Sequence, residues 1–81
     1  MNPETLIQTK RIKQLEAEGY YVIRLTVTNK PGIPDLVAIP PGSPVLFSEI
    51  KQPGESLDPL QEYRKKELES FGFKTEVFDG A

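Results

Sequence analysis

Two short apolar runs, joined by a turn rich in proline and glycine, occupy residues 30–51 and limit the folds open to this chain. The first run is 36–39, the turn is 40–44, and the second run is 45–51. Runs of this length between turn residues predict two β-strands that pair as a hairpin. Because residues 36–39 are all apolar, this strand is expected to be buried on both faces.

The predicted hairpin gathers charged side chains at one end. Side chains alternate along 45–51, so Glu49 and Lys51 share a face, and pairing would bring Asp35, just before the first run, close to them. Two carboxylates and a lysine at the rim of a sheet suit a metal-dependent site that cleaves phosphodiesters. The lysine can orient the attacking water or help deprotonate it, and the backbone carbonyl of Ile50 is placed to add an oxygen ligand.

The composition narrows the choice of metal. Among 81 residues there is no Cys and no His, which excludes disulfides and the usual zinc ligands. Oxygen ligands remain, and these favour Mg²⁺, Mn²⁺ or Ca²⁺. With 10 basic and 12 acidic residues the net charge is −2, which is weak evidence against a nucleic-acid partner.

The length predicts one domain spanning residues 1–81. No apolar run reaches membrane-spanning length and no signal-peptide pattern is present, so we expect a cytoplasmic protein without a membrane partner. A core this small, without disulfides, would gain stability from a homodimer.

A helix is predicted over residues 2–18, with Asn2 as its cap and Pro3 in the first position. Ile12 and Leu15 define its inward stripe, and Gln8 falls between them on the helical wheel. Glu4 lies one turn before Gln8 on nearly the same face.

The remaining elements are a strand over 20–28, a second helix that Asp58 and Pro59 open and Gly72 ends, and a strand over 73–78. The order is therefore α-β-β-β-α-β. We expect an α/β fold in which helices flank a central mixed sheet.

One family carries these motifs in the same order. P-D-L at 34–36 precedes E-I-K at 49–51 and resembles the PD-(D/E)XK nuclease signature. The strings G-I-P-D-L-V, E-I-K-Q-P-G, L-D-P-L-Q and F-G-F resemble its VRR-NUC (virus-type replication-repair nuclease) branch. The similarity is to the small stand-alone members of bacteriophages and covers nearly the whole chain. It implies a restriction-endonuclease-like domain in the cytoplasm of a bacterial host.

The resemblance implies that Asp35 and Glu49 bind the metal and that Lys51 is the catalytic lysine. Gln61 matches a glutamine at the start of the family's second helix, and a residue of the first helix completes the metal site. Gln8 is our first choice for that residue and Glu4 the second. The implied activity is a Mg²⁺- or Mn²⁺-dependent DNA endonuclease, selective for branched or junction DNA and acting as a homodimer.

Other interpretations stay open at this point. Asp35 could be a loop aspartate, Glu49 and Lys51 an exposed ion pair on an edge strand, and Gln61 part of a capping box. Three basic features are expected at the solvated surface: Lys30, Arg24 and the basic run 64–66. Tyr20 and Tyr21 are expected to make core or dimer contacts. The rival functions are a non-cleaving nucleic-acid-binding or accessory domain and a structural protein without a nucleic-acid role.

Overall fold

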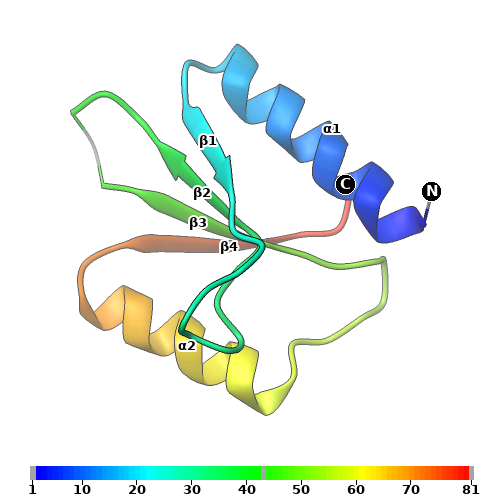
Figure 1. Cartoon of the computed structure of the whole chain (residues 1–81), viewed down its shortest axis with the longest axis vertical. Helices are drawn as coiled ribbons and strands as arrows, with labels where there is room; N and C mark the ends of the chain where they lie inside the picture. Colours follow the sequence, from blue (N-terminus) through cyan, green and yellow to red (C-terminus); the bar gives the residue numbers. More distant parts are fainter. Residues whose placement is uncertain (1, 43, 81) are drawn as a thin grey trace.

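The computed structural model describes residues 2–42 and 44–80 as a small α/β domain. Its elements are α1 (Pro3–Ala17), β1 (Tyr21–Arg24), β2 (Leu36–Ile39), β3 (Leu46–Ile50), α2 (Pro59–Ser70) and β4 (Lys74–Phe78). Figure 1 shows the strands as a central layer with α1 on one side and α2 on the other. The predicted fold class and element order are confirmed. In the described part of the chain, no helix combines the length and apolarity needed to cross a membrane.

The sheet is mixed, with its strands in the order β1-β2-β3-β4. β2 is antiparallel to both β1 and β3, so the two apolar runs do form a hairpin, with Val37 opposite Phe47. β3 and β4 are parallel, and parallel neighbours require a crossover connection. Helix α2 provides that crossover and lies on the face of the sheet opposite α1.

The main core lies between α1 and the sheet. Leu36, Ile50 and Phe78 are buried there, and Ile7, Ile12 and Val22 pack against them. Leu15 is also buried, at 1% exposure, which confirms the inward stripe predicted for the first helix. Full burial of such side chains stabilises a fold by roughly 1.5–3 kcal/mol each.

An ion pair fastens α1 to the same face of the sheet. Arg11 Nε and Nη2 donate to the two carboxylate oxygens of Glu76 at 2.8 and 2.7 Å, and Ser48 Oγ donates to Glu76 Oε2 at 2.6 Å. The Arg11 guanidinium also lies 4.7 Å from the ring centroid of Phe78. Burial opposes ionisation of Glu76, but the hydrogen bonds from Arg11 and Ser48 outweigh it and lower the pKa of this carboxyl group.

The strand predicted over 20–28 is too long, because β1 ends at Arg24. Beyond it, the Leu25 N–H donates to the Asp35 carbonyl at 2.8 Å. Ile33, which would make the next hydrogen-bonded pair with Val27, instead donates its N–H to the Lys30 carbonyl at 3.1 Å, so the ladder stops. The strands predicted over 45–51 and 73–78 are shorter by end residues only, as 46–50 and 74–78.

The prediction that residues 36–39 are buried on both faces is wrong for one face. Leu36 and Ala38 are fully buried toward α1, whereas Ile39 on the other face is 39% exposed. The reason is that α2 packs mainly on β4 and leaves β1 and β2 uncovered. We call this area the open sheet face; it comprises Tyr21, Ile23, Val37 and Ile39.

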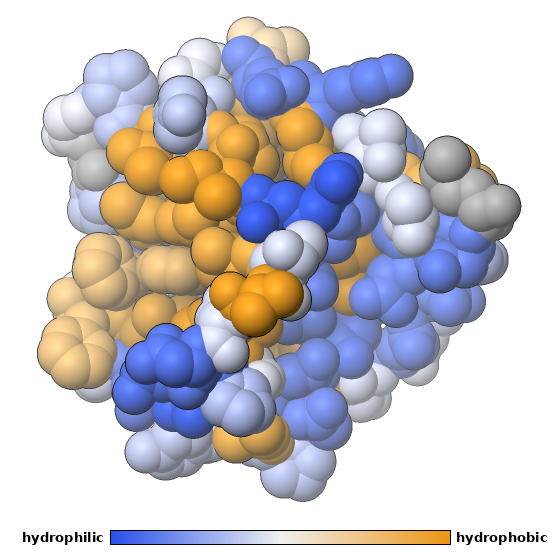
Figure 2. Space-filling view, viewed as in Figure 1, coloured by the Kyte–Doolittle hydropathy of each residue, from blue (hydrophilic) through white to orange (hydrophobic). Residues whose placement is uncertain are grey.

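Tyr21 belongs to the open sheet face and is 70% exposed, so it is not a core residue. Tyr20, directly before β1, is half-buried. Apolar side chains gather in the left half of Figure 2, where Figure 1 places the strands. One face of the sheet therefore exposes apolar side chains to solvent, whereas the other face is covered by α1.

Candidate active site

The hairpin brings the two predicted carboxylates together. Asp35 lies directly before β2, and its Oδ2 accepts a hydrogen bond from the Ile50 N–H at 2.7 Å. Glu49 precedes Ile50 on β3, is only 6% exposed, and is hydrogen-bonded to Asp35. Asp35 is thus not a free loop aspartate, and Glu49 is not part of an exposed ion pair.

The proximity of the two acids changes the ionisation of Glu49. Burial is the largest cause, followed by the hydrogen bond with Asp35 and the Asp35 charge, and together they raise the pKa of Glu49 to about 8. The charge of Lys51 acts in the opposite direction without cancelling these effects. Asp35 and Glu49, which we call the acid pair, therefore hold a proton between them at neutral pH, as two close carboxyl groups do when no cation separates them.

Lys51 and Ile50 extend the same segment. The backbone N–H of Lys51 donates to the Phe78 carbonyl at 3.0 Å, which continues the pairing of β3 with β4 by one residue. This hydrogen bond fixes the backbone of Lys51, and the charge of the Lys51 side chain acts on Glu49. The Ile50 side chain is fully buried in the core, and its backbone N–H donates to Asp35. Packing of the core therefore also fixes the position of Asp35.

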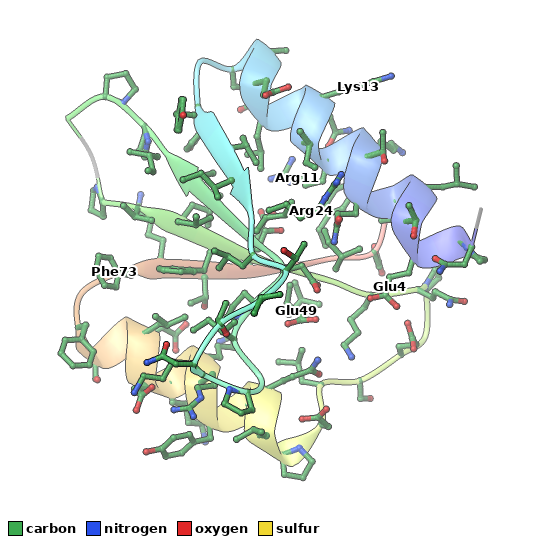
Figure 3. All side chains as sticks on the ribbon, viewed as in Figure 1. Glu4, Arg11, Lys13, Arg24, Glu49 and Phe73 are labelled. Atoms are coloured by element: carbon green, nitrogen blue, oxygen red, sulfur yellow. The ribbon has the colours of Figure 1, made fainter. Side chains whose placement is uncertain are left out.

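Of the two first-helix candidates, the geometry favours Glu4. Its charge contributes to the raised pKa of Glu49, and Figure 3 shows its side chain extending from the first turn of α1 toward the centre of the molecule, where Glu49 lies. Gln8 is half-buried, and no hydrogen bond within residues 2–42 and 44–80 joins it to Asp35 or Glu49. Which of the two completes the metal site stays a prediction.

The site fits a cation that needs few protein ligands. Within the described residues, no group of three or more His, Cys, Asp or Glu side chains is arranged to hold a metal ion. Mg²⁺ commonly binds through one or two carboxylates and keeps several waters, so Asp35 and Glu49 would suffice. A divalent cation would also supply the positive charge that this protonated acid pair lacks.

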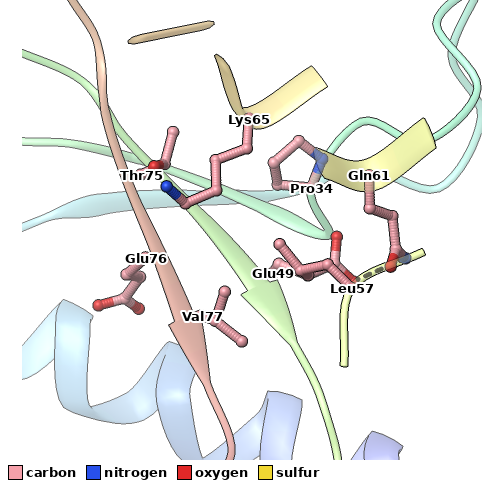
Figure 4. Close-up of a pocket in the computed structure, with 8 residues that line it drawn as sticks. All are labelled: Pro34, Glu49, Leu57, Gln61, Lys65, Thr75, Glu76 and Val77. Atoms are coloured by element: carbon pink, nitrogen blue, oxygen red, sulfur yellow. Dashed lines mark hydrogen bonds between the residues drawn. The ribbon is translucent and has the colours of Figure 1, made fainter. Parts of the chain in front are cut away.

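Gln61 reaches the acid pair from the start of α2. Its Nε2 donates to Glu49 Oε2 at 3.3 Å, the contact drawn as a dashed line in Figure 4. The same residue forms a capping box with Asp58, which confirms that interpretation of Gln61, and its amide contacts Glu49 at the same time. Pro34, Leu57 and Val77 line a shallow pocket with Glu49 and Gln61.

Two contacts that the sequence did not predict tie α2 to the loop leading into Asp35. Arg64 Nε donates to the Pro31 carbonyl at 2.9 Å, and its side chain is only 14% exposed, so the expected solvated face is wrong for this residue. Gly32 lies against Leu60: a Cβ added there would stand 2.6 Å from Leu60 Cγ. Gly32 belongs to the motif identified in the sequence, but its contact with Leu60, 28 residues later, could not be predicted from the sequence.

The comparisons with known proteins agree with the fold. The sequence profile of the VRR-NUC domain matches residues 4–81. A solved structure described as a VRR-NUC domain superposes with a TM-score of 0.87 at 26% sequence identity, covering 98% of this chain and 86% of that one. A search of curated proteins gave no significant match.

Proposed function

Because the chain belongs to the VRR-NUC domain family, we propose that it is a metal-dependent endonuclease that hydrolyses phosphodiester bonds in DNA. The observation that carries the proposal is the convergence of Asp35, Glu49 and Lys51 at the end of β3. Asp35 is 14 residues before Glu49 in the sequence, and a buried carboxyl group such as Glu49 has no role in packing that an apolar side chain would not fill better.

Each residue has a defined part in this proposal. Asp35, fixed by the Ile50 N–H, and Glu49, fixed by Gln61, would hold a Mg²⁺ or Mn²⁺ ion. When bound, such an ion shields phosphate charge and lowers the pKa of water. Lys51, on the same segment, would orient the attacking water or stabilise charge that develops on the phosphate.

The test is cleavage of linear, branched and four-way-junction DNA with Mg²⁺ or Mn²⁺ by the wild type and by Lys51→Ala. Lys66→Ala is the matched control, because Lys66 is an exposed lysine on α2. We expect Lys51→Ala to cut about 10²–10³-fold more slowly at an unchanged melting temperature, whereas the control keeps wild-type activity. Equal rates for all three proteins would refute the assignment.

We further propose a homodimer that acts on branched or junction DNA. The open sheet face supports the dimer, since it exposes Tyr21, Ile23 and Ile39 on neighbouring strands. A second copy covering this face would bury apolar surface and place two sites in one particle, which suits symmetric cutting.

Light scattering on the wild type, on Ile23→Lys and on Val27→Lys tests the dimer. Val27 is 93% exposed and lies outside the strands, so it controls for the added charge. We expect twice the 9.1 kDa mass of one chain for the wild type and the control, and a single-chain mass for Ile23→Lys. A wild type that is still monomeric at about 100 µM, well above the dissociation constants of stable dimers, would exclude the proposed homodimer.

A non-cleaving nucleic-acid-binding domain is the second candidate. It is favoured because, within residues 2–42 and 44–80, no three His, Cys, Asp or Glu side chains are arranged to hold a metal ion. DNA binding that persists without any cleavage in Mg²⁺ or Mn²⁺ would support this candidate over the nuclease.

A further inference from the structure

We propose that Asp58 is a positioning residue of the candidate site, because its capping box sets which end of the Gln61 amide faces Glu49. The inference rests on the proposed function for its kinetic test, but not for its structural test. It concerns a helix cap that touches neither carboxylate of the acid pair directly.

The polarity of the contacts is fixed by the backbone. Asp58 Oδ1 accepts from the Gln61 N–H at 2.9 Å, and the Asp58 N–H donates to Gln61 Oε1 at 3.1 Å. Since a backbone N–H can only donate, the amide end facing Asp58 must be the oxygen. The opposite end, Nε2, is therefore the one that faces Glu49 Oε2, at 3.3 Å.

A donor at this position has a specific effect on the acid pair. The Gln61 amide occupies one oxygen of Glu49 and holds the carboxyl group in a fixed orientation beside Asp35. Such outer contacts orient metal-ligating carboxylates and affect how well they bind. If the amide rotated by half a turn, its oxygen would face Glu49 and the hydrogen bond that Nε2 donates to Glu49 Oε2 would be lost.

The same argument explains why residue 61 is glutamine. Glutamate completes a capping box equally well and also interacts favourably with the positive end of the helix. At this position, however, its carboxylate would lie against Glu49, which is 6% exposed and already paired with a second acid. Helix stability alone therefore does not select glutamine, whereas donation to Glu49 does.

The experiment compares Asp58→Ala, which removes the cap, with Asp58→Asn, which keeps an acceptor oxygen, and with Gln61→Glu. Lys66→Gly is the matched control, because it weakens α2 at an exposed position away from the box. NMR of the Gln61 side-chain NH₂ group in the metal-free protein reports whether the amide is fixed. Steady-state cleavage then separates kcat from KM.

We expect a rigid Gln61 amide in the wild type, in Asp58→Asn and in Lys66→Gly, and a rotating amide in Asp58→Ala. We expect kcat to fall about 10-fold in Asp58→Ala and at least as far in Gln61→Glu, with KM nearly unchanged. Asp58→Asn should restore kcat.

Matching amide signals and matching kcat in Asp58→Ala and Lys66→Gly, at similar melting temperatures, would overturn the inference and leave Asp58 as an ordinary helix cap. If the wild type cleaves no DNA, the proposed function fails. The amide signals alone then decide: a fixed amide in Asp58→Ala overturns the positioning role, and a rotating one supports it.

Discussion

Replacing Gly32 with alanine tests the packing that joins α2 to the loop before Asp35. Gly32 has a φ of +82°, and an added Cβ would meet Leu60 Cγ at 2.6 Å and the Leu60 backbone C and O at 3.1 Å. The left-handed conformation costs an L-residue roughly 1–2 kcal/mol. Overpacking adds about 1–3 kcal/mol, since part of the contact is backbone that cannot rotate away.

Gly32→Ala should therefore lower the free energy of unfolding by about 2–5 kcal/mol, a fall in melting temperature on the order of 10–30 °C for a chain of this size. Gly54→Ala is the matched control: Gly54 has a φ of +87° and nothing within 4 Å of its added Cβ. It carries the conformational cost alone, so the difference between the two variants measures the steric term.

The four proteins of a double-mutant cycle complete the test: wild type, Gly32→Ala, Leu60→Ala and the double variant, unfolded in urea and followed by circular dichroism. Leu60→Ala removes Cγ but leaves the backbone contacts at 3.1 Å, so we expect a partial rescue, with a coupling of about 1 kcal/mol. Equal losses in Gly32→Ala and Gly54→Ala, with no coupling to Leu60, would refute the reasoning.

Three further predictions concern ionisation and metal binding. Because the pKa of Glu49 is raised, its contribution to stability is complete below about pH 4.5 and is lost as the pH rises through about 8. Between pH 5 and 9 the free energy of unfolding of Glu49→Gln should therefore increase relative to that of the metal-free wild type, by on the order of 2 kcal/mol in urea unfolding. The pKa of Glu76 is lowered, so its stabilisation has the opposite pH dependence: it is present above about pH 4.5 and is lost as the pH falls further. In thermal melts, Glu76→Gln should therefore have a lower melting temperature than the wild type at pH 7 and nearly the same melting temperature near pH 3. Mn²⁺ at 100-fold above its Kd should stabilise the wild type by about 2.7 kcal/mol and leave Asp35→Asn unchanged by calorimetry; equal shifts in both proteins would place the ion elsewhere.

The amino-acid sequence determined the local features of this protein. Asn2 and Asp58 cap their helices as predicted, each followed by a proline in the first turn, and Ile12 and Leu15 face the core. These features follow from side chains acting within a few residues, through hydrogen bonds to the helix ends and through helical periodicity. The approach of Asp35 to Glu49 could also be predicted, because a hairpin brings together residues at known positions on its two strands.

The tertiary structure decided what depends on residues distant in the sequence. The end of β1 depends on Ile33 in the partner segment, whose N–H bonds the Lys30 carbonyl, and the exposure of Ile39 depends on where α2 packs. The raised pKa of Glu49 comes from burial, from Asp35 and from the charge of Glu4, which spacing in the sequence does not encode. Periodicity specifies which face a side chain occupies, but only the packed chain specifies which other group it meets there.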